Sequence, residues 1–196
     1  VEDGREERLE VGPVGLAGTV GWYDYSFRSE SLALPMRFYQ SKVAPGAARY
    51  FKEHRELLAR TDDLAEHHHR LTTRWMDGAY VRLPAHAPTD EQFARVLADK
   101  LARQLDWLAE RVDRIVVFIH HVPLARLMPQ LPGEQWQFVA AFMGSELFGG
   151  VCLAQPKVTD ILCGHTHQPA EARIGHVACR AIGSNYVNKR AVELAF

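Results

Sequence analysis

The spacing of hydrophobic positions changes along the chain and predicts helices that alternate with short strands. Between residues 93 and 112 apolar residues recur every three or four positions with charged residues between them, which predicts one long amphipathic helix. The segment Thr89-Asp90-Glu91-Gln92 stands directly before it and has the pattern of a capping box. A second helical pattern runs from about Glu134 to Leu153.

Short apolar runs between these segments predict the strands. Ile115 to Ile119 is a continuous apolar run, typical of a strand buried on both faces, and Val158 to Cys163 is another. Glycines punctuate the apolar segment from Leu9 to Gly21, which predicts a strand or a hairpin, and β-like segments occur at Ala172–Ile174 and Val177–Ile182. The alternation predicts an α/β layered fold, with residues 1–196 forming a single domain.

A charged stretch separates the first strand-like segment from the long helix. Residues 47–74 have a helical composition that is broken near Thr61, which could cap a second helix. The triplet His67-His68-His69 lies inside this stretch. Three consecutive residues on a helix point about 100° apart and cannot converge on one ion. We therefore expect the triplet to be solvated or to lie at the rim of a cleft.

Composition excludes several classes of protein. Of the 196 residues 47% are hydrophobic and 24% are charged, as in ordinary globular proteins, and the net charge is −1 with neutral histidines. This balance gives no electrostatic case for a nucleic-acid or anionic-membrane partner. No apolar run approaches the roughly 20 residues that cross a bilayer. Three cysteines without a C-x-x-C spacing argue against a disulfide framework, so we expect a reducing, cytoplasmic setting.

Histidines stand directly after two of the predicted buried strands, in His120-His121-Val122-Pro123 and in Gly164-His165-Thr166-His167. Ligands of open α/β sheets collect at the carboxyl ends of the strands, and imidazole is the commonest metal ligand. In an extended chain residues i and i+2 face the same way, so His165 and His167 could serve two nearby ions, whereas His120 and His121 should diverge. Either motif alone is common by chance; both together, each after a buried strand, favour a metal site.

The histidine motifs resemble those of a known family. Val117-Phe118-Ile119-His120 and Gly164-His165-Thr166-His167 are similar to the last two metal-binding motifs, V-x-x-H and G-H-x-H, of calcineurin-like metallophosphoesterases. The segments Gly18 to Ser26, Trp75-Met76-Asp77 and Gly183 to Tyr186 also resemble parts of bacterial putative phosphoesterases of that family. The resemblance spans nearly the whole chain, and G-H-x-H is its most specific element.

The resemblance implies a fold, an activity and a set of roles. The fold would be part of a four-layer α/β/β/α sandwich, and the activity hydrolysis of phosphate mono- or diesters at a site of two divalent ions of Mn, Fe, Zn or Ni type. His120 and His165 would bind one ion and His167 the other. The residues expected near the substrate in the cleft are His121, in a catalytic role, and Trp22, Tyr23 and Asp24.

Three motifs of the family are absent from this sequence: Asp-x-His, Gly-Asp-x-x-Asp and Gly-Asn-His. In the family they supply the bridging carboxylate and further ligands, and they precede the motifs found here. We therefore expect the chain to be the C-terminal portion of a longer domain, to bind metal weakly or singly, and to turn over little substrate without the missing half. Arg126 could contact a substrate phosphate.

Two functions of different classes remain open at this point. The first is a metal-dependent phosphoesterase that acts on a small phosphoester substrate. The second is a non-catalytic interaction module whose degenerate site holds one metal ion or none. The near-neutral charge disfavours a third, a nuclease of the same superfamily.

Overall fold

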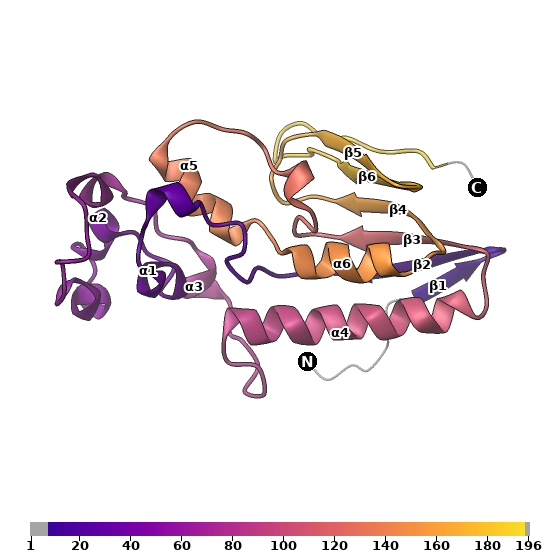
Figure 1. The fold of residues 1–196 in the computed structure, drawn as a ribbon, viewed down its shortest axis with the longest axis horizontal. Helices are drawn as coiled ribbons and strands as arrows, with labels where there is room; N and C mark the ends of the chain where they lie inside the picture. The colour runs from indigo at the N-terminus through magenta and orange to yellow at the C-terminus, as the bar shows by residue number, and fades with distance from the viewer. Residues whose placement is uncertain (1–7, 195–196) are drawn as a thin grey trace.

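The computed structural model describes residues 8–194, which contain one six-stranded sheet in the order β1-β2-β3-β4-β6-β5 (Figure 1). The four central strands are parallel, and an antiparallel strand flanks them at each edge. The strands are β1 (Arg8–Val11), β2 (Val14–Thr19), β3 (Arg114–Ile119), β4 (Val158–Cys163), β5 (Ala170–Ile174) and β6 (Val177–Ala181). The predicted α/β class and the strands predicted around residues 115–119 and 158–163 are confirmed.

The helices lie on one face of the sheet and beyond the arrowheads of β3 and β4 (Figure 1). The α-helices are α1 (Met36–Gln40), α2 (Pro45–Ala48), α3 (Asp77–Tyr80), α4 (Asp90–Ala109), α5 (Glu134–Val139) and α6 (Glu146–Ala154). Short 3-10 helices connect them: η1 (Glu30–Leu32), η2 (Lys52–Leu58), η3 (Glu66–Arg70), η4 (Ala125–Leu127) and η5 (Ala140–Phe142). None of the helices in residues 8–194 has the length and apolarity needed to cross a bilayer.

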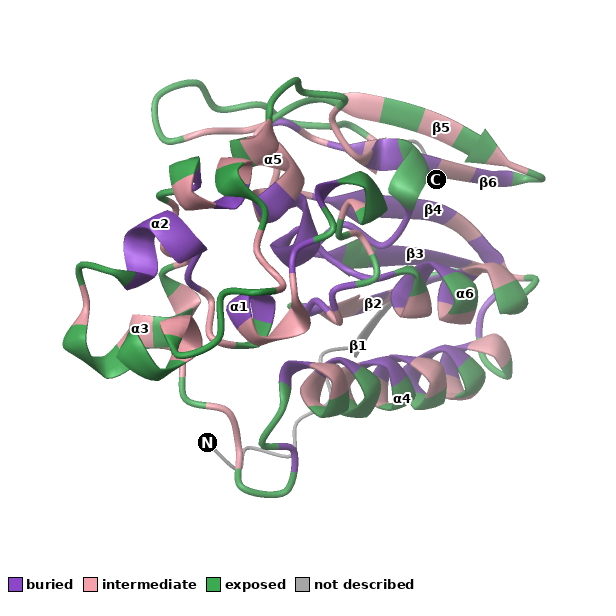
Figure 2. Cartoon of the chain, turned by 60° about the vertical axis from the view of Figure 1, so that its left-hand side comes forward, coloured by how far each residue is buried: buried purple, intermediate pink, exposed green. Residues whose placement is uncertain are grey.

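The predicted long helix and its cap are confirmed in α4. The Thr89 hydroxyl accepts from the Gln92 amide at 3.2 Å, and the Gln92 side chain accepts from the Thr89 amide at 3.3 Å. The apolar stripe of α4 packs onto β2 at Gly15, where an added Cβ would lie 2.8 Å from Leu108. Figure 2 shows the resulting bands of buried and exposed residues along the helix. Together α4 and α6 bury one face of the sheet.

The opposite face of the sheet is covered much less. Val14, Val116 and Leu162 are buried there, with Leu194 among the residues packed over them. Phe118 keeps 42% of its surface exposed, so the prediction that its strand is buried on both faces is wrong at this position. The four-layer sandwich is not seen either, because residues 8–194 form a single sheet.

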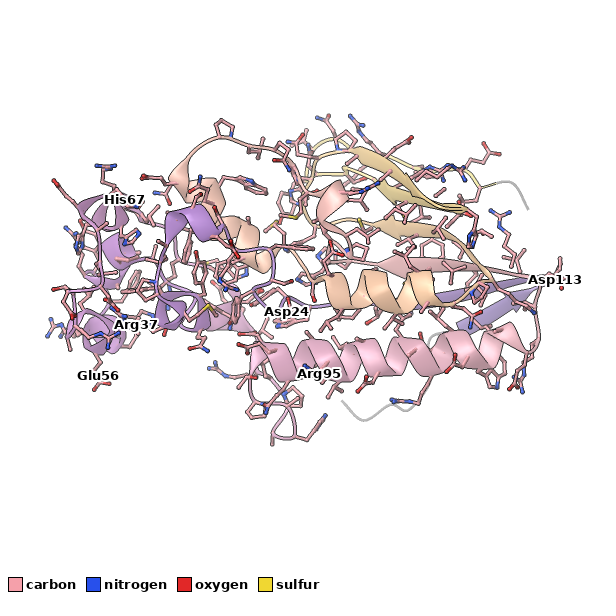
Figure 3. The ribbon with its side chains drawn as sticks, viewed as in Figure 1. Asp24, Arg37, Glu56, His67, Arg95 and Asp113 are labelled. Carbon is pink, nitrogen blue, oxygen red and sulfur yellow. The ribbon has the colours of Figure 1, made fainter. Side chains whose placement is uncertain are left out.

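Residues 30–80 form a lobe of short helical turns beyond the strand ends, which contains Arg37, Glu56 and His67 (Figure 3). The two helices expected within residues 47–74 are mainly the 3-10 turns η2 and η3, and Thr61 caps neither of them. The prediction that the histidine triplet is solvated is wrong for His68, which is 2% exposed. Its Nδ1 accepts from the Ala65 amide, so its Nε2 donates to the Leu32 carbonyl at 2.6 Å.

The helical pattern predicted from Glu134 to Leu153 is interrupted in the structure. At Gly144 an added Cβ would lie 1.9 Å from the Val122 carbonyl oxygen, so the chain there packs directly against the loop that follows β3. The Val122 amide donates to Met143, and the Val122 carbonyl accepts from Ser145. These contacts with residues about twenty positions away replace helical hydrogen bonds, and Ser145 begins α6 as its N-cap.

Candidate metal centre

Three loops meet where β2, β3 and β4 end. The His121 amide donates to the Val20 carbonyl at 3.1 Å, and the Gly164 amide donates to the His120 carbonyl at 3.1 Å. These bonds continue the pairing of the strands for one or two residues beyond their ends. Since the strands are parallel neighbours, the side chains that follow them arrive at one edge of the sheet.

The structure brings His120 and His165 together at this edge. His120 Nε2 lies 3.0 Å from His165 Nδ1, and the two rings are nearly perpendicular. His121 also packs against His165, with ring centroids 4.3 Å apart. The His120 and His121 rings lie with centroids 5.2 Å apart and planes inclined at 88°, and both contact His165.

Unusual backbone geometry gives His165 and His167 their positions. Both residues have positive φ angles, 67° and 56°, in the left-handed region that non-glycine residues rarely adopt. The segment is therefore a bend, and the extended geometry assumed for the H-x-H motif is wrong. Backbone of this kind costs of order 1–3 kcal/mol per residue and concentrates at functional sites.

His167 lies apart from the His120–His165 pair. Its ring contacts Tyr186, with centroids 5.1 Å apart and planes at 82°. Burial is the main cause of the lowered pKa of His120, and His167 is close enough to lower it further by repulsion between positive charges. The candidate site is thus an imidazole pair with a third imidazole beside it.

The surroundings of His120, His121 and His165 keep these three imidazoles neutral at pH 7. Burial, with repulsion from His121 and His120, lowers the pKa of His165 to about 3. Burial is also the main cause of a pKa of about 4 for His121 and of a lowered pKa for His120. A neutral imidazole keeps a lone pair, which metal coordination requires.

Hydrogen bonds define the state of His121. Its Nδ1 lies 3.0 Å from the Val20 carbonyl, which can only accept, so Nδ1 carries the proton and Nε2 the lone pair. Nε2 of His121 and Nε2 of His165 are buried, and neither makes a hydrogen bond of standard geometry within residues 8–194, although the backbone of Phe142 lies near enough to His165 to oppose the lowering of its pKa. Buried polar atoms without partners are uncommon and call for a ligand or another explanation.

Trp22 and Tyr23 form the wall behind His121, with ring centroids 5.2 and 5.8 Å from the imidazole. Tyr23 is fully buried, and Trp22 is 6% exposed. Asp24 lies between the lobe and the sheet (Figure 3). One of its carboxylate oxygens accepts from the Ser26 hydroxyl and the other from Ser145 at 2.7 Å. Contact of these three residues with substrate stays a prediction.

Two carboxylates near the site were not predicted from the sequence. Asp77 accepts hydrogen bonds from Tyr23 at 3.1 Å and from the indole of Trp75 at 2.9 Å. Its charge partly opposes the lowering of the pKa values of His120 and His165. Asp90 is buried and accepts from Trp22, Tyr25 and Lys42. Only the segment Trp75-Met76-Asp77 gave a signal, through its resemblance to the phosphoesterases.

The nitrogen atoms of His120 and His165 meet some of the requirements of a metal site. Two nitrogens bound to one ion at the usual metal–nitrogen distance of about 2.0–2.1 Å lie roughly 3–3.4 Å apart, close to the 3.0 Å between His120 and His165. Within the described part of the chain, however, no three His, Cys, Asp or Glu side chains are grouped so that they could hold an ion. The pair could supply two ligands, and an ion held there would need further ligands from elsewhere.

Comparisons with known proteins support the fold. No family model matches the chain, and no curated protein matches it. A solved structure of phosphopantetheinyl hydrolase from Mycobacterium tuberculosis, a protein of metallophosphoesterase-like fold, matches with a TM-score of 0.51 and 17% identity. The match covers 89% of this chain and 51% of that chain, so this chain spans about half the length of the hydrolase. At this identity the likeness concerns the fold alone.

Proposed function

We propose that this chain belongs to a metal-dependent phosphoesterase that hydrolyses phosphate mono- or diesters, with His120, His165 and His167 as metal ligands. The observation that carries the proposal is the approach of His120 Nε2 to His165 Nδ1 at the ends of two adjacent parallel strands. The similarity of the fold to a hydrolase of metallophosphoesterase-like fold supports it. A two-metal site supplies an activated water and neutralises charge on the phosphoryl group.

The residues of this chain divide into those that would hold metal and those that would hold the ligands in place. His120 and His165 would present neutral nitrogens to one ion, and His167 is the ligand proposed for the second. The buried ring of His121 packs against His165, which favours a positioning role beside the catalytic role expected from the resemblance. Trp22 and Tyr23 restrict the ring of His121 in turn.

The remaining ligands would come with a second sheet. We infer that this sheet packs against the sparsely covered face of β2 and β3, where Val20 and Phe118 are 48% and 42% exposed. Apolar side chains on a sheet face are stabilised when another layer covers them. Such packing would complete a four-layer sandwich and bring carboxylates to the histidines.

The proposal is tested by assaying the full-length protein with Mn²⁺ on a generic phosphodiester. We expect His120→Ala and His167→Ala each to lower kcat/KM at least 100-fold, because each variant removes a ligand of the ions that activate water. His54→Ala is the matched control, since His54 lies in the helical lobe and packs against Phe51. Full activity in both ligand variants would rule out the proposal.

A second function is favoured by the absence of a three-ligand group in residues 8–194. A non-catalytic interaction module would keep a weak metal site without turnover. Zn²⁺ binding that depends on His120 and His165, together with no phosphoester hydrolysis by the full-length protein, would establish this alternative.

A further inference from the structure

A short loop beside the candidate metal centre is held in a defined shape. The Ser184 hydroxyl donates to the Arg190 carbonyl at 3.1 Å and accepts from the Arg190 amide at 2.9 Å, which closes residues 184–190 into a ring of hydrogen bonds. Inside this ring the Asn185 side chain accepts from the amides of Val187 and Asn188. These hydrogen bonds therefore fix the backbone conformation of residues 184–190 before any ligand binds.

The base of the loop is fixed to the histidine segment. Gly183 has a φ angle of 74°, and a Cβ added there would lie 2.4 Å from the backbone nitrogen of Pro169. Only glycine permits this approach. Because Pro169 follows His167 by two residues, the loop and the candidate ligand His167 are held in one arrangement.

The tip of the loop exposes apolar surface next to His167. Tyr186 is 88% exposed and Val187 is 86% exposed, more than the other large hydrophobic residues that residues 8–194 expose. The Tyr186 ring meets His167 nearly at a right angle, with centroids 5.1 Å apart, so its remaining faces stay open to solvent. An aromatic ring held in place beside a candidate metal ligand can bind a planar group at little entropic cost.

We propose that Tyr186 binds the organic part of the phosphoester and selects substrates in which that part is an aromatic ring. The inference rests on the proposed function, because the phosphoryl group has to be held near His167 for its substituent to reach Tyr186. Stacking between aromatic rings is favourable enough to give a preference of roughly 3- to 10-fold over a small aliphatic group. Val187 extends the apolar surface on the same tip.

The test compares two phosphonates that cannot be hydrolysed, phenylphosphonate and methylphosphonate. Their binding to the full-length protein with Mn²⁺ is measured by isothermal titration calorimetry, which does not depend on turnover. We expect the wild type to bind phenylphosphonate 3- to 10-fold more tightly. Tyr186→Ala should abolish this preference without weakening methylphosphonate binding, whereas Tyr186→Phe should preserve it because the ring remains.

Tyr50→Ala is the matched control, because Tyr50 is 76% exposed but lies two residues beyond α2 in the helical lobe. If the wild type binds both phosphonates equally, or Tyr186→Ala keeps the preference, the inference about Tyr186 fails while the proposed function stands. If Tyr186→Ala weakens both ligands equally, the residue acts on His167 and the selective role is wrong. Absence of any Mn²⁺-dependent phosphonate binding to the wild type would overturn both proposals.

Discussion

At the scale of single residues, the groups around a buried polar side chain decide what it does. His68 and His121 are both nearly buried, but His68 uses both ring nitrogens in hydrogen bonds, whereas His121 leaves Nε2 without a protein partner in the described chain. The first is a structural histidine, and the second lies beside a candidate metal centre. The difference comes from the groups around each ring, since the side chains are identical.

Gln104 gives a prediction at this scale. It is fully buried on α4, and neither its amide nitrogen nor its oxygen has a hydrogen-bond partner within residues 8–194. A buried polar group without a partner costs about 1–3 kcal/mol. We expect Gln104→Met, which keeps the shape and removes the polar atoms, to raise the free energy of unfolding by about 1 kcal/mol in urea denaturation. A lower free energy of unfolding for Gln104→Met would show that the Gln104 side-chain amide has hydrogen-bond partners in solution.

At the scale of elements, local signals define α4 well and the lobe poorly. In α4 the capping box, the apolar period and the packing on β2 all favour the same helix. In residues 47–74 a helical composition gives 3-10 turns instead. Arg37 explains part of this difference, because its guanidinium donates to the carbonyls of Leu57 and Arg60 and pairs with Asp63. These bonds satisfy the ends of short turns that lack side-chain caps.

The cap of α4 gives the prediction for this scale. Thr89→Ala removes the acceptor for the Gln92 amide and should lower the free energy of unfolding by about 1 kcal/mol. Thr89→Ser keeps a hydroxyl and should restore most of the loss. Thermal and urea denaturation of the three proteins measure both effects. Equal destabilisation by Ala and Ser would mean that the threonine methyl group, rather than the cap, matters.

At the scale of the whole molecule, one face of the sheet is covered by helices and the other carries a row of charges. On that second face Asp160 in β4 pairs with Arg114 in β3 at 2.7 Å and with Arg180 in β6 at 3.4 Å. Burial raises the pKa of Asp160, but hydrogen bonds from Arg114 and Thr159 outweigh it and leave the pKa below its ordinary value. The carboxylate of Asp160 therefore links β3, β4 and β6.

The lowered pKa predicts how stability depends on pH. The contribution of Asp160 is complete above the unfolded-state pKa of about 3.9 and is lost as pH falls through the lower folded-state value. Asp160→Asn should thus cost about 2 kcal/mol at pH 7 and progressively less below pH 4 in urea titrations. Asp113→Asn is the control, because Asp113 is exposed at the far end of the molecule (Figure 3). A cost that stays constant between pH 7 and pH 3 would contradict the prediction.

The positions of the histidines relative to the apolar runs of the sequence were enough to predict where the candidate site lies. His120 and His165 are 45 residues apart, yet each follows a buried apolar run, and parallel strands end at a common edge. Asp77 could not be found in this way. It follows no strand, and its link to the site passes through Tyr23, which is 54 positions away.

The sequence by itself determined the features that depend on neighbouring residues: the period and cap of α4, the apolar runs of β3 and β4, and the histidines placed after them. Only the tertiary structure decided the features that depend on contacts across the chain. These are the exposed face around Phe118, the left-handed bend at His165 and His167, and the contact of Tyr186 with His167. The reason is physical: local patterns specify which side of an element is apolar, but only packing decides what covers that side.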